Sequence, residues 1–308
     1  SQLTSALVGD GMMRSMPPKR ERARNEPATT TDVVEGEQPP DDEFWRRVLT
    51  GESDNKSLVT WLRRVFGALP AEPRCRMCLA PYRAPFGPVV KALGFGPWAK
   101  NPTLCGGCLG LMERHKGGAE VELSIMFADL RGSTGMAARM SASSYSRLLD
   151  TYYGIAATAI AESGGIVDKY LGDGVLALFI PAYTGSGHGA AALQAARSIL
   201  ERTVDDEGIP IQERPLPVGV GPHTGTAFVG IVGRSGQPTD FTALGDAVNV
   251  AERVSSSAAE GELLVSRATV ASLGGPPAGA SQRTIELKGV AEPFEAWSIE
   301  RAARPLPM

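Results

Sequence analysis

Long apolar runs, surplus positive charge and cysteine are all scarce in this chain of 308 residues. No stretch holds eighteen uninterrupted apolar residues, so we expect no membrane span. The formal net charge of −3 argues against a nucleic-acid partner, because a protein that coats nucleic acid is basic. Four cysteines are too few for a disulfide framework, and the start of the chain lacks the apolar core of a signal peptide. We therefore expect a cytoplasmic protein.

The first part of the chain differs from the rest in composition. Residues 1–40 are rich in Pro, Gly, Arg, Asp and Glu and show no sustained period, which predicts a disordered tail. Residues 41–70 show helical spacing of apolar side chains. These are Phe44, Trp45, Val48 and Leu49, and then Leu58, Trp61, Leu62, Val65 and Phe66. Such a stripe either packs on a neighbouring domain or joins two subunits, and we assign 41–70 as a helical dimerisation or linker segment.

From Ala119 onward, strand and helix patterns alternate. Strands are predicted over 121–128, 166–170, 175–180, 216–220, 227–232, 262–266, 285–287 and 295–299. Helices are predicted over 141–162, 188–203 and 247–257. The order predicts an α+β fold in which helices cover a mainly antiparallel sheet, with residues 119–308 as one domain.

All four cysteines lie within residues 71–118, as two C-x2-C pairs: Cys75 with Cys78, and Cys105 with Cys108. Each such turn places two thiolates on one side of a tight loop, and two turns complete a site of four sulfurs. We therefore predict a metal-binding module. Zn²⁺ would act as a staple, whereas an iron–sulfur cluster would make the module a redox or oxygen sensor.

Two aspartates end strand candidates close to glycines. Asp129 lies in the segment FADLRGST of residues 127–134, and Asp173 lies in KYLGDG of residues 169–174. A convergent pair of carboxylates suits Mg²⁺, which prefers oxygen ligands and completes its shell with water and substrate phosphates. The pair therefore indicates chemistry on a nucleoside triphosphate.

These segments belong to a longer ordered set of motifs. HTG at 223–225, TALGDAVNVAER at 242–253 and LKG at 287–289 follow the two aspartate segments. In this order and spacing, the chain from about Ala119 resembles the class III nucleotidyl cyclase homology domain. The cysteine module also resembles a segment that precedes some bacterial cyclase domains. The resemblance implies a ferredoxin-like cyclase fold and ATP or GTP as substrate.

The resemblance also implies roles for the metal and phosphate residues. Asp129 and Asp173 would hold two Mg²⁺ or Mn²⁺ ions, with the carbonyl of Leu130 as a further ligand. One ion would activate the ribose 3′-hydroxyl, and the other would neutralise the triphosphate. The turn that would donate backbone amides to the phosphates consists of Gly132, Ser133 and Thr134.

By the same resemblance, Lys169 and Thr242 would read the base. A lysine donor and a hydroxyl acceptor complement N1 and the exocyclic amine of adenine, and guanylate-specific relatives typically carry an acid in place of Lys169. Asn249 would bind the ribose, Arg253 the pentavalent phosphorus and Lys288 the triphosphate tail. A guanidinium that meets developing phosphoryl charge is worth ~3 orders of magnitude in rate.

In the family, the metal acids come from one subunit and the base-reading and phosphate-stabilising residues from the other. The sequence therefore predicts a homodimeric adenylate cyclase that converts ATP to 3′,5′-cyclic AMP and pyrophosphate, with the cysteine module as a regulatory element. The alternatives are a guanylate cyclase and a non-catalytic nucleotide sensor with a cyclase fold. We assign His223 a structural role, in a segment between two strands.

Overall fold

A pair of long antiparallel strands, β1 (Gly117–Leu130) and β4 (Val218–Val232), forms the centre of the fold. The computed structural model describes residues 42–52, 58–70, 73–98, 102–115, 117–204, 206–233, 239–287 and 293–301. The tail predicted over 1–40 and the site residue Lys288 lie outside these ranges. The described residues all belong to one unit, residues 39–308.

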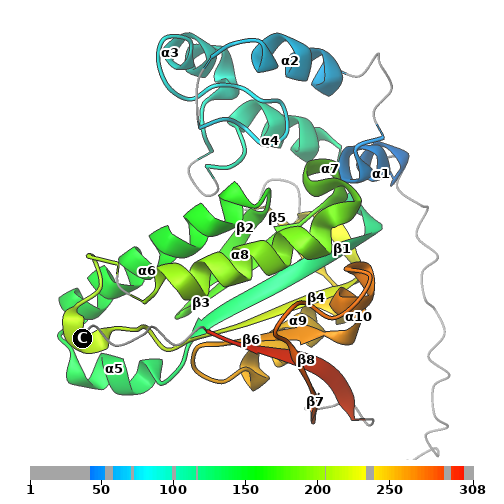
Figure 1. Cartoon of the computed structure of the whole chain (residues 1–308). Coiled ribbons are helices and arrows are strands. Elements are labelled where there is room, and N and C mark those ends of the chain that lie inside the picture. Colours follow the sequence, from blue (N-terminus) through cyan, green and yellow to red (C-terminus); the bar gives the residue numbers. More distant parts are fainter. Residues whose placement is uncertain are drawn as a thin grey trace, which may run out of the picture. The chain divides into compact units, whose positions relative to one another are not determined.

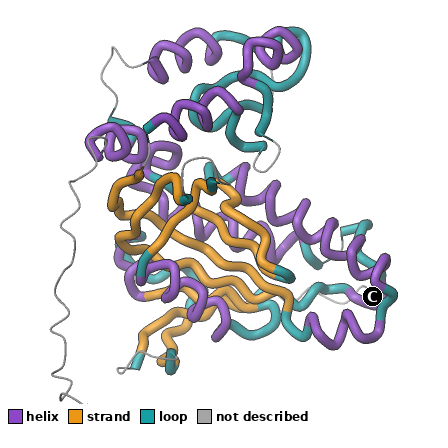
Figure 2. Tube along the Cα trace, turned by 180° about the vertical axis from the view of Figure 1, so that it is seen from behind, coloured by secondary structure: helices purple, strands orange, loops and turns teal. Residues whose placement is uncertain are grey.

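Eight strands form one sheet in the order β2-β3-β1-β4-β6-β8-β7, with β5 also paired to β4. The other strands are β2 (Ile166–Leu171), β3 (Gly174–Phe179), β5 (Asp240–Leu244), β6 (Glu262–Ser266), β7 (Ser281–Ile285) and β8 (Phe294–Glu300). All pairings are antiparallel except that between β4 and β6. The predicted α+β class and mainly antiparallel sheet are confirmed. Figure 2 shows the strands side by side from behind.

Helices cover both faces of the sheet. Alternate side chains of β1 point to opposite sides, so this strand contributes to the buried core on each face. Leu123, Ile125 and Phe127 belong to one core cluster, whereas Met126 and Ala128 belong to another. The second cluster includes α6 (Ala142–Glu162) and α8 (His188–Arg202), which lie side by side in Figure 1. The first includes residues of α1 (Asp42–Thr50) and α9 (Asp246–Ser257).

Shorter helices complete the described chain. They are α2 (Leu58–Gly67), α3 (Gly87–Val90), η1 (Lys91–Phe95), α4 (Gly106–Arg114), α5 (Ser133–Arg139), α7 (Pro181–Thr184), η2 (Gly185–Gly187), η3 (Ile211–Glu213) and α10 (Arg267–Ser272). The stripe predicted on α1 packs within the chain, where Trp45 and Leu49 are buried. On α2 the stripe is split, because Leu62 and Phe66 are buried while Trp61 is 57 % exposed.

One predicted break in the sheet is wrong. Residues 216–220 and 227–232 are expected to form two strands, but β4 runs without interruption from Val218 to Val232 and includes His223. The prediction left residues 221–226 between the two strands, and this stretch contains Pro222, which lacks a ladder donor. Among the described residues, β4 pairs with β6 at Val220 and with β5 only from Phe228 onward, so its proline-containing middle is paired only with β1.

Candidate active site

The two predicted metal acids meet at the β2–β3 hairpin. Asp129 lies opposite Gly174 across β1 and β3, and Asp173 occupies the turn just before Gly174. The backbone amide of Leu130 donates to the carbonyl of Asp173 at 3.3 Å, which ties the end of β1 to this turn. A Cβ atom at position 174 would lie 2.0 Å from Oδ1 of Asp129, so only glycine leaves room for the carboxylate. The fold thus brings both acids to one edge of the hairpin.

The surroundings of Asp129 disfavour an unaccompanied negative charge. Burial raises the pKa of this carboxyl group; Arg131 counteracts the shift, and the negative charges of Asp173 and Glu252 add to it. Two convergent carboxylates in a partly buried site match the donor set of a hard divalent cation. The acids therefore fit the predicted Mg²⁺ or Mn²⁺ ions in donor type, and the carbonyl of Leu130 follows in sequence.

Arg131 connects this acidic edge to α9, and sequence reasoning did not select it. Its guanidinium donates to the carbonyl of Ser255, near the end of α9. It also lies over Gly219, where a Cβ atom would approach Nε of Arg131 to 2.5 Å. Because Gly219 has no side chain, the guanidinium of Arg131 can cross β4 at this position. The only sequence signal was its place inside the FADLRGST motif.

The predicted phosphate turn follows directly. Gly132 has φ of +66°, in the left-handed region that favours glycine, and α5 begins at the next residue. No side chain caps this helix start, and Thr134 is exposed. Backbone amides of Gly132, Ser133 and Thr134 thus lie just beyond the acidic edge in the chain.

The predicted base-reading residues lie on two strands that side chains connect. Nζ of Lys169 on β2 lies 2.9 Å from a carboxylate oxygen of Asp240 on β5. The hydroxyl of Thr242, also on β5, donates to Oδ2 of Asp168 on β2 at 2.6 Å. Lys169 and Thr242 are therefore brought together by two carboxylates, Asp168 and Asp240, neither of which the sequence analysis selected.

A β-bulge explains how neighbouring residues of β2 both reach β5. Val167 pairs with Ala177 and Lys169 pairs with Leu176, so Asp168 is an extra residue without a partner on β3. A bulge re-aims side chains that would otherwise point to opposite faces. The bulge interrupts the regular alternation of side chains along β2, so the direction of the Asp168 side chain could not be predicted from the sequence.

The last predicted group lies on α9. Asn249 and Arg253 stand four residues apart and therefore share a face of the helix, while Val250 and Val254 are buried. Asn249 is exposed and Arg253 half-buried. Within the described ranges, no hydrogen bond or ion pair joins either residue to Asp129 or Asp173.

His223 has structural partners. Its Nδ1 lies 3.0 Å from the hydroxyl of Ser266, and burial lowers the pKa of its imidazole to about 4. The ring is therefore neutral at pH 7. The hydrogen bond links β4 to the end of β6, in keeping with the structural role expected from sequence.

Comparison with known proteins identifies the family. The family model for the adenylate and guanylate cyclase catalytic domain matches residues 118–300, more than half of the chain. The chain belongs to this family. Over 187 residues it is 32 % identical to an adenylate cyclase of Anabaena cylindrica, covering 58 % of this chain and 36 % of that protein. Over 157 residues it is 31 % identical to the terminal-differentiation-specific adenylate cyclase of Dictyostelium discoideum, covering 49 % of this chain and 7 % of that protein.

Solved structures agree with the family. The adenylyl cyclase CyaB from P. aeruginosa superposes with a TM-score of 0.51 at 26 % identity, covering 61 % of this chain and 98 % of that one. This chain spans about a third or less of the length of the two sequence relatives. None of the helices in the described part is long and apolar enough to cross a membrane.

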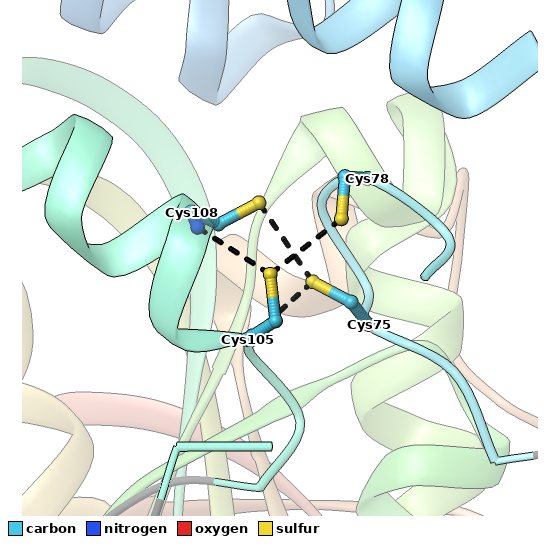
Figure 3. A group of neighbouring side chains, drawn as sticks. All are labelled: Cys75, Cys78, Cys105 and Cys108. Carbon is cyan, nitrogen blue, oxygen red and sulfur yellow. Dashed lines mark hydrogen bonds between the residues drawn. The ribbon is translucent and has the colours of Figure 1, made fainter. Parts of the chain in front are cut away.

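The four cysteines preceding the cyclase domain converge on one point (Figure 3). All four are buried, and their sulfurs lie within 4.8 Å of one another. The Sγ atoms of Cys75 and Cys108 are 3.9 Å apart, and those of Cys78 and Cys105 are 3.6 Å apart. Zn–S bonds of ~2.3 Å in a tetrahedron place sulfurs about 3.8 Å apart, so the spacing fits one ion.

Two different local structures supply the sulfurs. Cys75 and Cys78 form a turn that closes with a 2.9 Å hydrogen bond from the amide of Leu79 to the carbonyl of Cys75. Leu79 takes the left-handed conformation, with φ of +64°, which is costly for leucine. Cys105 is the N-cap of α4 and accepts from the amide of Cys108, where the helix dipole favours thiolates.

The other end of α4 contacts the chain next to β5, the strand that carries Thr242. The hydroxyl of Thr239, just before β5, donates to Glu113 of α4 at 3.0 Å. Trp45 of α1 donates from its indole to the carbonyl of His115 at 2.6 Å and stacks on Phe241 of β5, with ring centroids 6.3 Å apart. The cysteine module therefore contacts the residue before β5 directly through α4, and it is connected to Phe241 of β5 through Trp45 of α1.

Proposed function

We propose that this chain is an adenylate cyclase that converts ATP to 3′,5′-cyclic AMP and pyrophosphate. The observation that carries the choice of ATP is the proximity of Lys169 to Thr242 across β2 and β5. The ammonium can donate to the acceptor N1 of adenine, and the hydroxyl can accept from the exocyclic amine. Guanine presents the reverse pattern at this edge, so the pair discriminates against GTP.

The remaining residues divide the reaction among them. In the proposed reaction, the 3′-oxygen bonds to the α-phosphorus, the bond to pyrophosphate breaks and the 3′-hydroxyl loses its proton. Asp129 and Asp173 would hold the divalent ions, which when bound would lower the pKa of that hydroxyl and neutralise the triphosphate. Asn249 binds the ribose, and Arg253 stabilises the charge on the pentavalent phosphorus. The amides of 132–134 and the side chain of Lys288 bind the phosphates.

The active unit is proposed to be a homodimer. Within the described ranges, no hydrogen bond or ion pair joins Asn249 or Arg253 to Asp129 or Asp173, and in the proposed dimer a second subunit supplies the α9 pair to these acids. Exposed apolar side chains flank the site residues: Tyr170 is 46 %, Leu171 47 % and Leu244 48 % exposed. Association would bury these side chains and complete two sites at once.

Complementation tests the shared site. Asp129→Asn and Arg253→Ala are each expected to be inactive alone. Mixing them in equal amounts should restore about a quarter of wild-type activity, since half the dimers would carry one intact site. No recovery after subunit exchange would contradict a shared site.

The module is proposed to hold one Zn²⁺ and to set the placement of β5. The sulfur spacing supports a single ion, because a multi-iron cluster spreads its thiolates over different irons. The purified chain should be colourless and contain one zinc per four cysteines by elemental analysis. Iron with visible absorption would instead favour a redox sensor. The proposed division remains 41–70 helical, 71–118 metal-binding and 119–308 catalytic.

The first test of function measures product. The purified chain is incubated with ATP or GTP and Mn²⁺, and the cyclic nucleotide is quantified, with Asp173→Ala as the inactive control. Cyclic AMP from ATP that disappears in the variant supports the proposal. Preferential formation of cyclic GMP would indicate a guanylate cyclase, and no product from either would indicate a nucleotide sensor.

A further inference from the structure

Asp168 is a buried carboxylate for which the reaction has no direct use. Its side chain has no exposed surface, although Lys169 beside it is one-third exposed. Burying an ionised carboxylate is costly unless donors surround it. One donor is the hydroxyl of Thr242, at 2.6 Å from Oδ2, while Oδ1 has no hydrogen-bond partner among the described residues. Nζ of Lys169 lies 3.8 Å from Oδ1, so this ion pair and the Thr242 hydroxyl together stabilise the carboxylate, and the hydroxyl is the group that bonds to Oδ2.

The hydrogen bond restricts what Thr242 can offer to a base. A threonine hydroxyl has one proton to donate and two lone pairs that accept. An ionised carboxylate only accepts, so at 2.6 Å the proton must point to Asp168. The carbonyl of Ala243 lies at 3.4 Å from the same oxygen and is too weak a competitor. The lone pairs of Thr242 are then left for a ligand.

We propose that Asp168 is a specificity-determining positioning residue, which fixes Thr242 as an obligate hydrogen-bond acceptor for the exocyclic amine of adenine. Without this constraint, the hydroxyl could rotate and donate to the O6 atom of a guanine-like base. The inference rests on the proposed function and deepens it. Asp240 complements the arrangement, because its 2.9 Å ion pair holds the ammonium of Lys169 on the same side of β5.

The geometry depends on the β-bulge. Asp240 and Thr242 are two residues apart on β5 and so project from one face, where they meet adjacent residues of β2. In a regular strand Asp168 and Lys169 would point to opposite faces. The extra residue at 168 lets one strand supply both the lysine that donates and the carboxylate that turns threonine into an acceptor.

Inosine triphosphate isolates the proposed contact. It carries the same ribose and triphosphate as ATP, but it replaces the amine and the N1 acceptor with O6 and an N1 donor. The ratio of kcat/KM for ATP to that for inosine triphosphate therefore cancels effects on the shared parts of the substrate. We would measure it at pH 8 with Mn²⁺ for wild type, Asp168→Ala, Asp168→Asn and Thr242→Val.

Asp168→Ala is expected to lower the ratio about tenfold, the worth of one hydrogen bond. Asp168→Asn should lower the ratio less, since the amide can either accept or donate. This variant replaces Asp168→Ala in the test if the alanine variant does not fold. In the Thr242→Val background, Asp168→Ala should leave the ratio unchanged, because its effect acts through that hydroxyl. Asp150→Asn, an exposed aspartate on α6, is the matched control and should match wild type.

The outcomes separate the two proposals. Cyclic AMP formation by wild type with a ratio unchanged within twofold in both Asp168 variants would overturn the role of Asp168 alone. A fall in the ratio that persists in the Thr242→Val background would also overturn it, since Asp168 would then act by another route. A wild type that makes no cyclic nucleotide, or prefers GTP, would overturn the proposed function and this inference with it.

Discussion

The cysteine module and the cyclase domain differ in how much regular secondary structure surrounds their buried side chains. The cyclase domain buries two layers of apolar side chains on an eight-stranded sheet. Between Arg74 and His115 the described chain has only short helices and two isolated bridges, Arg74 to Pro81 and Pro97 to Cys105. Its four buried sulfurs lie in one cluster with a few apolar side chains, among them Met77, Leu104 and Met112. The comparison teaches that the cyclase domain relies on burial against its sheet, whereas the module has a small apolar core that the proposed ion would supplement.

Removing the proposed ion should have the largest effect, and it should be confined to the module. Structural zinc contributes on the order of 10 kcal/mol of folding free energy at pH 7. Cys108→Ser, or strong chelation, should abolish hydrogen-exchange protection in residues 73–98 and 102–115 while β1 keeps its own. Loss of protection in both regions together would show that the two parts do not differ in this way.

Substituting Asp129, a proposed metal ligand, should lower activity and leave the stability of the chain nearly unchanged. Asp129→Asn preserves the shape of the side chain beside Gly174 but weakens divalent-ion binding. We expect kcat/KM for ATP to fall by ~10³ with little change in melting temperature, since metal catalysis is worth several kcal/mol. The exposed variant Asp150→Asn provides the control. Activity within tenfold of wild type would remove Asp129 from the proposed site.

Trp45 sharpens the comparison because it contacts both parts. It is fully buried, bonds to His115 and stacks on Phe241. Trp45→Ala should destabilise the chain by about 3 kcal/mol through the lost packing. Trp61→Ala, at a side chain that is 57 % exposed, should change the unfolding temperature little. Equal effects of the two variants in thermal unfolding would contradict the described packing of α1.

The smallest expected effect is a pH dependence of base selectivity. Burial raises the pKa of Asp168 to about 6, against the hydrogen bond from Thr242; the charged groups facing it are Lys169 and Asp240. Below pH 6 the carboxyl group is protonated and no longer forces the Thr242 proton toward itself. For wild type, the ratio of kcat/KM for ATP to that for inosine triphosphate should therefore fall several-fold from pH 8 to pH 5.5. In Asp168→Asn the ratio should stay flat across this range.

Much of the fold was predictable because its signals are local. The helix over 141–162 has an N-cap serine and a Gly164-Gly165 stop, and the structure places it at Ala142–Glu162. The C-x2-C pairs predicted a four-sulfur cluster, and the sulfurs converge. The bound ion, the dimer and the assigned roles of the site residues remain predictions.

The unpredicted features depend on non-local contacts. The continuity of β4 through Pro222 is possible because β1 supports that stretch from one side. The strand β5 is five residues long and was not assigned, since its pairing with β4 cannot be read from its own sequence. The partnership of Asp168 with Thr242 spans 74 residues and a bulge, so no spacing rule reveals it.

The central stretch of β1 has a further consequence. Residues 124–129 are paired on both sides, with β3 and with β4, so their amides are shielded by two ladders. Such amides exchange with solvent only when the whole domain unfolds, whereas the edge strands open locally. Asp129 lies at the end of this doubly paired stretch. The backbone that carries this carboxylate is therefore expected to keep its position when the edge strands open.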